Sequence, residues 1–493
     1  MKINYIAILA VTTMLVLSVV SCSKSFLEKT PISALTTGNF YKTASDAEAG
    51  LAGAYSFGAN EYYIWDFEIN GDVRSDNCYA GGNSGDVQAI DNLRLTPTNG
   101  NVTRDWSYLY RCVASANSVL DNVPKVKDPA LSEERKKQIL GEAKFLRALH
   151  YFNLTGLYGE VPLVLTAETT DLYPKRDAVE TVYMQIEQDL KDAENSLPVT
   201  ADAAGRVTKG AAQALLAKVY AQRNKYDECL QACNRVLPAK FGGAGTGGYD
   251  LLPNYDFLWD NQHKNSAESI FEIQHSSTIS GFGQWGINLY LPFSLTGDTW
   301  AKFCSPSNDI VNVFRSEGDS IRLHASVFWE NTVATNTTPP PYTSATQPVP
   351  FSYKWRMTGG GSWNGDCNTI LLRLADIILL KAEALNNTGR TPEAASLVNA
   401  IRARVNLPPI TAPTQALMAD AILKERRLEL AFEGHRWWDL MRSGTDNLIK
   451  VMNILVDPAN KPLAYNISAS DLIFPIPQTE RDLNKNLTQN SGY

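Results

Sequence analysis

Two segments of this chain, residues 211–237 and 372–405, carry the same arrangement of small and apolar residues. The first reads AAQALLAKVYAQRNKYDECLQACNRVL and the second reads LRLADIILLKAEALNNTGRTPEAASLVNAIRARV. The equivalent positions are Ala217, Tyr220, Cys229, Cys233 and Val236 in the first segment, and Ala382, Leu385, Ala394, Val398 and Ile401 in the second. This spacing predicts a helix, a short polar turn and a second helix in each segment. The chain is therefore expected to stack helices, because a single hairpin cannot bury its own apolar face.

Each segment resembles a tetratricopeptide-type hairpin, in which small residues let two helices approach closely. Because such hairpins are stable only when stacked, we expect neighbouring helices in residues 103–158 and 178–222. Within the first of these, Ser132 and the glutamates that follow it predict a helix start, and Gly159 predicts the end of that helix.

The composition changes between the helical segments. Residues 56–102 and 241–366 are rich in Gly, Asn, Ser, Thr, Pro and aromatic residues. Loops this long inside a compact protein are usually functional or disordered, and the aromatic residues argue against plain disorder. The predicted fold class is mainly α: tetratricopeptide-like helical hairpins packed against a loop-rich ligand-binding region, as in an α-α superhelix.

The N-terminus reads MKINYIAILAVTTMLVLSVVSC, with one lysine before an apolar run that spans residues 3–20. This run is near the lower length limit for a membrane-spanning helix, so a permanent anchor is one interpretation. A cleaved signal peptide over residues 1–21 fits better, because the tripeptide before Cys22 resembles a bacterial lipobox. Lipid on Cys22 would then attach the protein to a membrane. No other stretch is long and apolar enough to span a bilayer.

Charge and cysteine usage exclude some classes of site. The formal charge is −7, and binding to nucleic acid needs clustered Lys and Arg, so nucleic acid is not an expected partner. Cys229 and Cys233 lie four residues apart, but no His or third Cys is near them, so we predict small buried residues and no metal site. We expect no cofactor. Export permits disulfides, but spacing alone does not define a pairing among the other internal cysteines. These are Cys78, Cys112, Cys304 and Cys367.

The stretch FEGHRWWDLMRSG, residues 432–444, contains the residue types of an active site. Nucleophilic catalysis needs a Ser, Cys or Thr beside the histidine, and none has suitable local spacing. Glycosidase chemistry needs two carboxylates that face each other across a cleft, which one helix does not provide. The His-Glu-x-x-His pattern of zinc peptidases is also absent from the sequence. We therefore interpret the stretch as structural.

A continuous helix is expected from Ala421 through this stretch, ending at Gly444. His435 lies one turn before Asp439, which predicts a hydrogen-bonded His–Asp pair within a buried polar network. Glu433 and Arg436 are spaced as i, i+3 partners on the outer side of that helix.

Several long motifs follow one another along the chain, among them CSKSFLEKTPISALTTGNFYKTASDAEAGLAGAY, GEAKFLRALHYFNLTGLYGEVPLV, RLADIILLKAEALNNTGRTPEAASLVNAIRARVNLP, ERRLELAFEGHRWWDLMRSG and LIFPIPQTERDLNKNLTQNSGY. In this order they resemble the SusD/RagB family of outer-membrane nutrient-binding lipoproteins from Bacteroidetes. The resemblance implies a signal peptide (1–21), a SusD-like N-terminal helical region (22–240) and a C-terminal region with long loops and closing helices (241–493). The two regions are expected to form one compact unit.

The resemblance implies a non-enzymatic function. Members of the family bind glycan or another nutrient at the outer membrane and deliver it to a SusC-like TonB-dependent transporter. The expected localisation is the outer membrane, lipid-anchored through Cys22 and facing the cell exterior. Two alternatives remain open from the residues: binding of a non-glycan nutrient such as a peptide, and a polysaccharide-degrading enzyme.

Sugar binding needs exposed aromatic faces for stacking and nearby polar groups for hydrogen bonds. Two loop stretches combine both. The candidate ligand-binding residues are Tyr62, Tyr63, Trp65, Asp72, Arg74, Asp76, Gln284, Trp285, Asn288, Tyr290 and Trp300. Further loop tryptophans offer alternatives at Trp329, Trp355 and Trp363. Trp106 is at helical spacing with Leu109 and Val113 and is predicted to be core.

Overall fold

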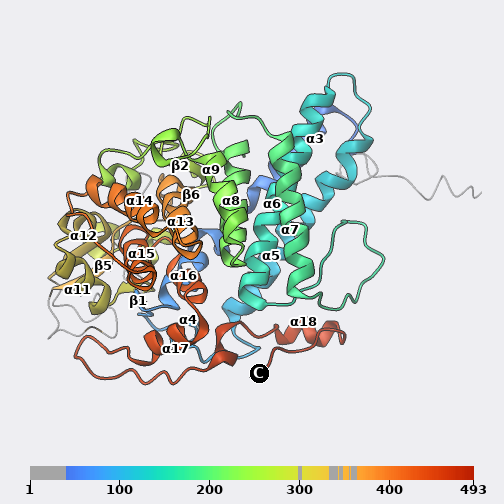
Figure 1. Ribbon diagram of the computed structural model, residues 1–493. Helices are drawn as coiled ribbons and strands as arrows, with labels where there is room; N and C mark the ends of the chain where they lie inside the picture. The colour runs from blue at the N-terminus through green and yellow to red at the C-terminus, as the bar shows by residue number, and fades with distance from the viewer. Residues whose placement is uncertain (1–39, 298–302, 332–341, 343–347, 355, 357–362) are drawn as a thin grey trace, which may run out of the picture.

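The computed structural model describes residues 40–297, 303–331, 342, 348–354, 356 and 363–493 (Figure 1). Helices dominate it, as the sequence predicts. Those of the first half are α3 (Ala44–Tyr55), α4 (Gly85–Asp91), α5 (Gly100–Asn122), α6 (Glu133–Tyr158), α7 (Val179–Ser196), α8 (Lys209–Gln222) and α9 (Tyr226–Val236). Those of the second half are α10 (Phe293–Thr296), α11 (Asn308–Glu317), α12 (Ser320–Ser326), α13 (Leu374–Asn387), α14 (Thr391–Arg404), α15 (Gln415–Glu429), α16 (Arg436–Arg442), α17 (Thr445–Asn453) and α18 (Gln478–Leu483).

The two repeat segments form the predicted hairpins, α8 with α9 and α13 with α14. Every equivalent position of the repeat is buried. The turns also match: Asn224 and Gly389 occupy the same offset, and both have left-handed backbone, with φ of 54° and 81°. Glycine adopts this conformation without strain and asparagine tolerates it, so two different residues give the same turn.

The hairpins stack in chain order. Helix α6 contacts α5 and α7, α7 contacts α8, and α13 packs against both α8 and α9. Figure 1 shows these helices side by side, from α5–α7 on the right to α13–α15 on the left. The neighbouring helices expected in residues 103–158 and 178–222 are thus confirmed. The Ser132 side chain caps α6 by accepting from the Arg135 N–H at 3.1 Å, and Gly159 ends that helix with φ of 73°.

Short antiparallel pairs connect distant parts of the chain. The strands are β1 (Cys78–Tyr79), β2 (Ser269–Ile273), β3 (Ser305–Pro306), β4 (Val327–Glu330), β5 (Val349–Ser352) and β6 (Thr369–Arg373). They pair as β1–β3, β2–β6 and β4–β5. Two π-helical turns, η2 (Tyr62–Asp66) and η3 (Ile69–Val73), lead into β1, and a 3-10 turn, η7 (Gly286–Leu289), follows β2.

One hydrophobic core runs through the helical layer, with members from Ala47 to Leu487. Trp106 is 4% exposed, which confirms it as a core residue, and Cys229 and Cys233 are fully buried within α9. Across the part of the chain that the structure describes, no helix combines the length and apolar character needed to cross a membrane.

Candidate ligand-binding site

The active-site-like stretch FEGHRWWDLMRSG is not one helix. Helix α15 ends before it and α16 begins only at Arg436. Between them, Phe432 and Gly434 have positive φ angles of 62° and 75°. Their backbone N–H groups donate to the carboxylate of Asp72, at 3.2 and 2.6 Å. The expectation of a continuous helix is wrong, because the chain turns here to bring these N–H groups to a carboxylate from the other half of the molecule.

The pairings of this stretch also differ from those predicted. Glu433 is buried and binds Arg373 at 2.6 Å and Lys354 at 2.6 Å, instead of Arg436. Arg436 binds the Asp76 carboxylate through two hydrogen bonds of 2.7 and 2.9 Å. The predicted outward i, i+3 pair is wrong, because Glu433 lies in the turn before α16 and the two side chains point into different buried clusters.

His435 does not pair with Asp439. Its Nδ1 lies 3.2 Å from Lys218 Nζ, while Asp439 accepts from Arg426 at 2.9 Å and Arg442 at 2.8 Å. Burial first, and then the Lys218 ammonium, lower the pKa of His435 to about 3. The imidazole is therefore neutral and accepts from the ammonium. The predicted buried polar network is confirmed, but with arginines and a lysine as its cations.

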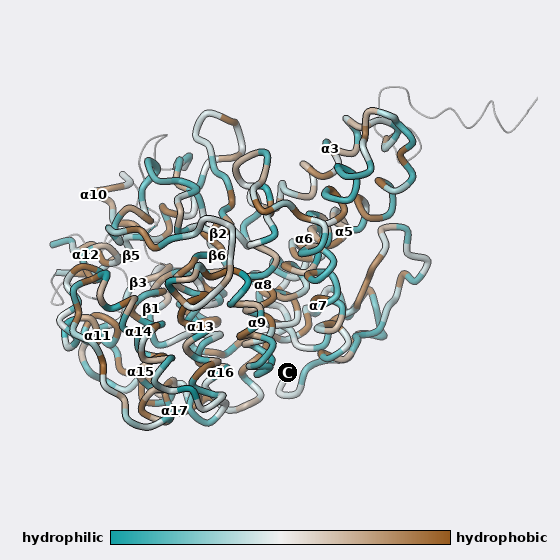
Figure 2. The backbone as a smooth tube through the Cα atoms, turned by 45° about the horizontal axis from the view of Figure 1, so that its top comes forward, coloured by the Kyte–Doolittle hydropathy of each residue, from teal (hydrophilic) through white to brown (hydrophobic). Residues whose placement is uncertain are grey.

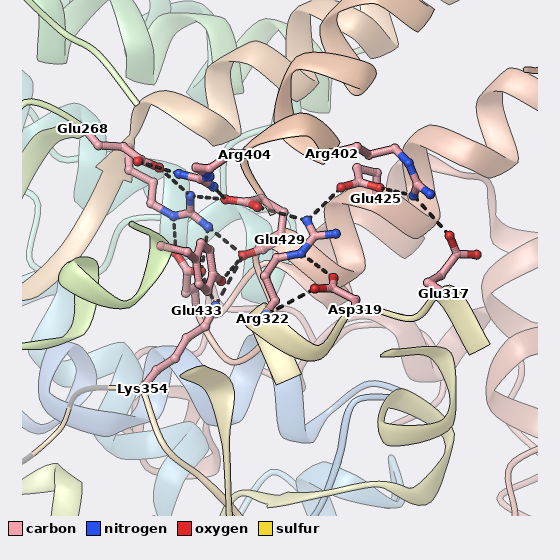
Figure 3. A network of polar contacts seen from close by, with 12 residues as sticks. Glu268, Glu317, Asp319, Arg322, Lys354, Arg402, Arg404, Glu425, Glu429 and Glu433 are labelled. Atoms are coloured by element: carbon pink, nitrogen blue, oxygen red, sulfur yellow. Dashed lines mark hydrogen bonds and ion pairs between the residues drawn. The ribbon is translucent and has the colours of Figure 1, made fainter. Parts of the chain in front are cut away.

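A second cluster extends this network, and Figure 3 shows its members around Glu429. Glu429 binds Arg373 at 2.7 Å, Arg322 at 3.0 Å and also Arg404. Although burial alone would raise it, these cations hold the pKa of Glu429 well below its usual range. A general acid needs a raised pKa, so this carboxylate is suited to structure and not to proton donation.

The first candidate stretch lies in the core. The expectation that it forms an exposed face is wrong for all its members, which are between 0 and 6% exposed. They are Tyr62, Tyr63, Trp65, Asp72, Arg74 and Asp76. Trp65 packs under the Arg104 guanidinium, 4.7 Å from the ring centroid. Arg74 lies over the rings of Trp437 and Phe474, at 4.2 and 4.5 Å. The polar and aromatic mixture that suggested a sugar site is a buried network here.

The residues of the second candidate stretch differ in their exposure. Gln284 (3% exposed), Asn288 (0%) and Tyr290 (2%) are buried, so the expected exposure is wrong for them as well. Trp285 is half-buried, and Trp300 lies outside the described residues. Tyr290 donates to the backbone carbonyl of Trp65 at 2.8 Å, which joins the two stretches inside the protein.

Gln284 fixes the base of an exposed loop. Its backbone exchanges two hydrogen bonds with Gly365, of 2.8 and 2.9 Å. Its side chain donates to the Ile64 carbonyl at 3.2 Å and to Thr369 Oγ1 at 3.0 Å. Nearby, the Asn364 amide donates to the Ser277 carbonyl at 2.6 Å. The loop between β2 and α10 is thereby held against the loop that precedes β6.

Two tryptophans flank this bridge. Trp285 is half-buried against the core, and Trp363 is 48% exposed. Their ring centroids are 6.4 Å apart and the ring planes are inclined by 33°. We refer to Trp285 and Trp363 as the tryptophan pair. Figure 2 shows α10, which follows Trp285 in the chain, at the upper left, apart from α3, α6 and α7 on the right. Of the predicted aromatics, this pair alone combines an exposed ring with a fixed base among the residues that the structure describes.

A cavity of about 360 Å³ opens under the other side of the same loop. Its wall includes Phe57, Ile273, Ile279 and Phe282, and Arg206 and His275 add polar groups. Ile279 and Phe282 are 55 and 44% exposed. The volume lies in the range of small-ligand sites. Sequence reasoning missed this cavity, because its wall is assembled from three separate segments, residues 52–59, 204–206 and 271–282, and none of them contains a recognisable motif.

The other loop tryptophans, Trp329 and Trp355, offer weaker candidates for ligand binding. Trp329 is half-buried on β4, with the Arg315 guanidinium 5.1 Å from its ring centroid. Trp355 lies outside the described residues. Within the described ranges, no group of three or more His, Cys, Asp or Glu side chains could hold a metal ion.

Comparison with known proteins identifies the family of this chain. Residues 321–493 match the family model described as the SusD family, and residues 25–221 match the model described as starch-binding associating with outer membrane. A laminarin binding SusD-like protein of known structure is 30% identical and superposes with a TM-score of 0.75, covering 92% of this chain and 100% of its own. The chain belongs to the SusD family.

Other relatives of this SusD family member also match it over most of their length. SusD-like protein P38 of Formosa agariphila is 28% identical over 88% of this chain and 90% of its own length. Starch-binding protein SusD of Bacteroides thetaiotaomicron is 23% identical over 88% of this chain and 86% of its own. A SusD superfamily structure from Bacteroides vulgatus has a TM-score of 0.79 at 23% identity, over 92% and 100% of the two chains. The mainly helical, tetratricopeptide-like fold class is confirmed.

Proposed function

We propose that this SusD family member binds glycan on its loop face and delivers it to a TonB-dependent transporter at the outer membrane. The observation that carries the proposal is the tryptophan pair, an exposed ring beside a half-buried one, on two loops that hydrogen bonds hold together. A sugar ring presents an apolar C–H face, and an inclined pair of indoles offers two surfaces to consecutive sugar units.

The names of two relatives support a class of glycan for this proposal. One similar structure is described as laminarin binding, and another relative as starch-binding. Both names refer to glucose polymers. Because the relative named for laminarin is the more similar of the two, at 30% against 23% identity, laminarin is the first ligand to test and starch the second.

The proposed localisation rests on the N-terminus and on the family description as outer-membrane associated. Cys22 lies outside the described residues, and we propose that it carries the lipid anchor. Replacement of Cys22 by Ala is then expected to release the protein from the membrane fraction. Co-purification of the wild-type protein from detergent-solubilised membranes tests the transporter, because a stable partner would be recovered with it.

Calorimetric titration with laminarin and starch oligosaccharides tests glycan binding. We expect Trp363→Ala and Trp285→Ala each to weaken binding by about 1–3 kcal/mol, which is roughly fivefold to a hundredfold or more in affinity. The variant Phe282→Ala alters the neighbouring cavity, and its affinity should stay near wild type. If Phe282→Ala weakens binding while both tryptophan variants bind normally, the cavity is the site and the proposed location is wrong.

Product analysis in the same experiment separates binding from degradation. Oligosaccharide recovered at its original length after long incubation supports a binding protein, whereas shortened products would establish an enzyme. Binding of peptides in place of every glucan would contradict the glycan proposal.

A further inference from the structure

Two buried cysteines from distant parts of the chain lie in contact. The Sγ atoms of Cys78 and Cys304 are 3.1 Å apart, across a sequence separation of 226 residues. Their side chains are 2 and 1% exposed. Cys78 begins β1, and Cys304 immediately precedes β3, the strand with which β1 pairs. Backbone pairing therefore holds the two sulfurs together independently of any bond between them.

We propose that Cys78 and Cys304 form a disulfide in the exported protein. The two thiols are free in the structure, but their separation is well inside the sum of two sulfur van der Waals radii. A disulfide needs about 2.05 Å, so closure requires a movement of about 1 Å. The proposal rests on export to an oxidising compartment, which the outer-membrane description of the family supports.

The step balances through thiol–disulfide exchange with an exported oxidoreductase that carries a disulfide. The Cys78 thiolate attacks one sulfur of that disulfide and releases the other as a thiolate. The Cys304 thiolate then attacks the Cys78 sulfur of this mixed disulfide and releases, as a thiolate, the cysteine of the oxidant that was bound to Cys78. Two protons and two electrons leave the pair, and the disulfide of the oxidant becomes a dithiol.

Oxidation must precede complete burial. Burial raises the pKa of both thiols, so neither is a reactive thiolate in the folded protein. The bond therefore forms while β1 and β3 come together, and it is then protected. The disulfide would join the segment that follows η3 to the segment that leads into β3. Close to it, the rings of Phe303 and Trp65 pack with their centroids 5.8 Å apart.

A matched control exists in α9. Cys229 and Cys233 are equally buried, with sulfurs 3.9 Å apart, but they are four residues apart on one helix. Cβ atoms at this helical spacing are about 5–6 Å apart, too far for the 3.5–4.5 Å of a disulfide. These two cysteines should remain thiols in the same sample.

The test is peptide mapping of the full chain purified from exporting cells. The protein is denatured in excess alkylating reagent without reductant and then digested. We expect one linked peptide pair that contains Cys78 and Cys304, and alkylated Cys229 and Cys233. Recovery of Cys78 and Cys304 as separate alkylated peptides, or a link from either to another cysteine, would overturn the proposal.

Urea unfolding gives a second readout. The midpoint of wild type should fall when reductant is present, because a constraint on the unfolded chain is lost. The Cys78→Ala variant should show one midpoint in both conditions, while Cys233→Ala should keep the wild-type difference. A wild-type midpoint that reductant does not change would contradict the bond.

Discussion

Asp72 accepts a hydrogen bond of 2.6 Å from the backbone N–H of Gly434, across a separation of 362 residues. The two backbone segments also approach closely, since a Cβ added at Gly71 would lie 2.2 Å from the Gly434 carbonyl oxygen. Burial raises the pKa of Asp72 to about 6, although hydrogen bonds from Asn77 and from two backbone N–H groups oppose that rise. The stretch FEGHRWWDLMRSG thus begins with a turn that is folded around a buried carboxylate.

The first prediction compares two glycines of this region. Gly434 and Gly444 both have positive φ, 75° and 103°, which a side chain disfavours. A Cβ at Gly434 would also meet Phe67 at 2.8 Å, whereas nothing lies within 4 Å at Gly444. We expect Gly434→Ala to lower the free energy of unfolding by about 2–4 kcal/mol and Gly444→Ala by about 1 kcal/mol. Equal losses in urea unfolding would show that steric contact at Gly434 is unimportant.

A second prediction concerns Asp91, whose carboxylate accepts from the Ala80 N–H at 2.8 Å and from the Tyr465 hydroxyl at 2.7 Å. Burial raises its pKa to about 7. An acid with a raised folded pKa contributes stability that is complete below its unfolded pKa, near 4, and is lost as pH rises through 7. The free energy of unfolding of wild type should therefore fall between pH 4 and 8, and Asp91→Asn should reduce this fall by on the order of 4 kcal/mol.

Urea unfolding at a series of pH values measures this difference. The control is Asp420→Asn at an exposed site on α15, whose pH profile should follow wild type. A profile for Asp91→Asn that runs parallel to wild type over the whole range would contradict the assigned titration.

The third prediction concerns the network of Figure 3. Arg373 binds Glu268 at 3.0 Å, Glu429 at 2.7 Å and Glu433 at 2.6 Å, and all four side chains are buried. Arg373→Met keeps the volume but leaves buried carboxylates without this cation. We expect a loss of about 3–5 kcal/mol in unfolding free energy.

The exposed pair Arg390–Glu393 provides the comparison for that variant. Arg390→Met should leave the urea midpoint unchanged, because solvent screens an exposed pair. A similar midpoint for Arg373→Met and wild type would mean that the network adds no stability.

The fourth prediction distinguishes buried from exposed tryptophans. Trp65 is 6% exposed and Trp363 is 48% exposed. We expect Trp65→Ala to lower the free energy of unfolding by about 3–5 kcal/mol through lost packing, and Trp363→Ala to leave the melting temperature near wild type. Calorimetric scans of both variants measure this. A large destabilisation by Trp363→Ala would assign that ring to the core and remove it from the proposed site.

Much of the helical layer could be predicted from sequence, because its signals are local. The spacing of Ala217, Cys229 and Cys233 reports the buried face of a hairpin, and Ser132 and Gly159 mark the ends of one helix through their own side chains or backbone freedom. The resemblance to the SusD family was equally accessible, since it rests on contiguous motifs. These features depend on neighbours a few residues away, which the sequence displays directly.

The candidate ligand-binding residues were predicted less well than the helices. Asp72, Arg74 and Asp76 combine with aromatic residues in a pattern that suits a sugar site. Each of these groups, however, also binds a partner that lies about 360 to 400 residues later in the chain. Residue type alone does not distinguish a polar group facing water from one that is buried and paired.

The sequence by itself determined the stacked hairpins, the family and the loop regions rich in aromatic residues, because periodicity and motif order are properties of contiguous chain. Only the tertiary structure decided which aromatics are exposed and which carboxylates are paired. Trp65 is buried and Trp363 lies at the surface. The helix predicted from Ala421 to Gly444 is interrupted, so that the Gly434 N–H reaches Asp72. The physical reason is that burial and charge pairing are set by contacts between distant segments, and these exist only after the hairpins have packed.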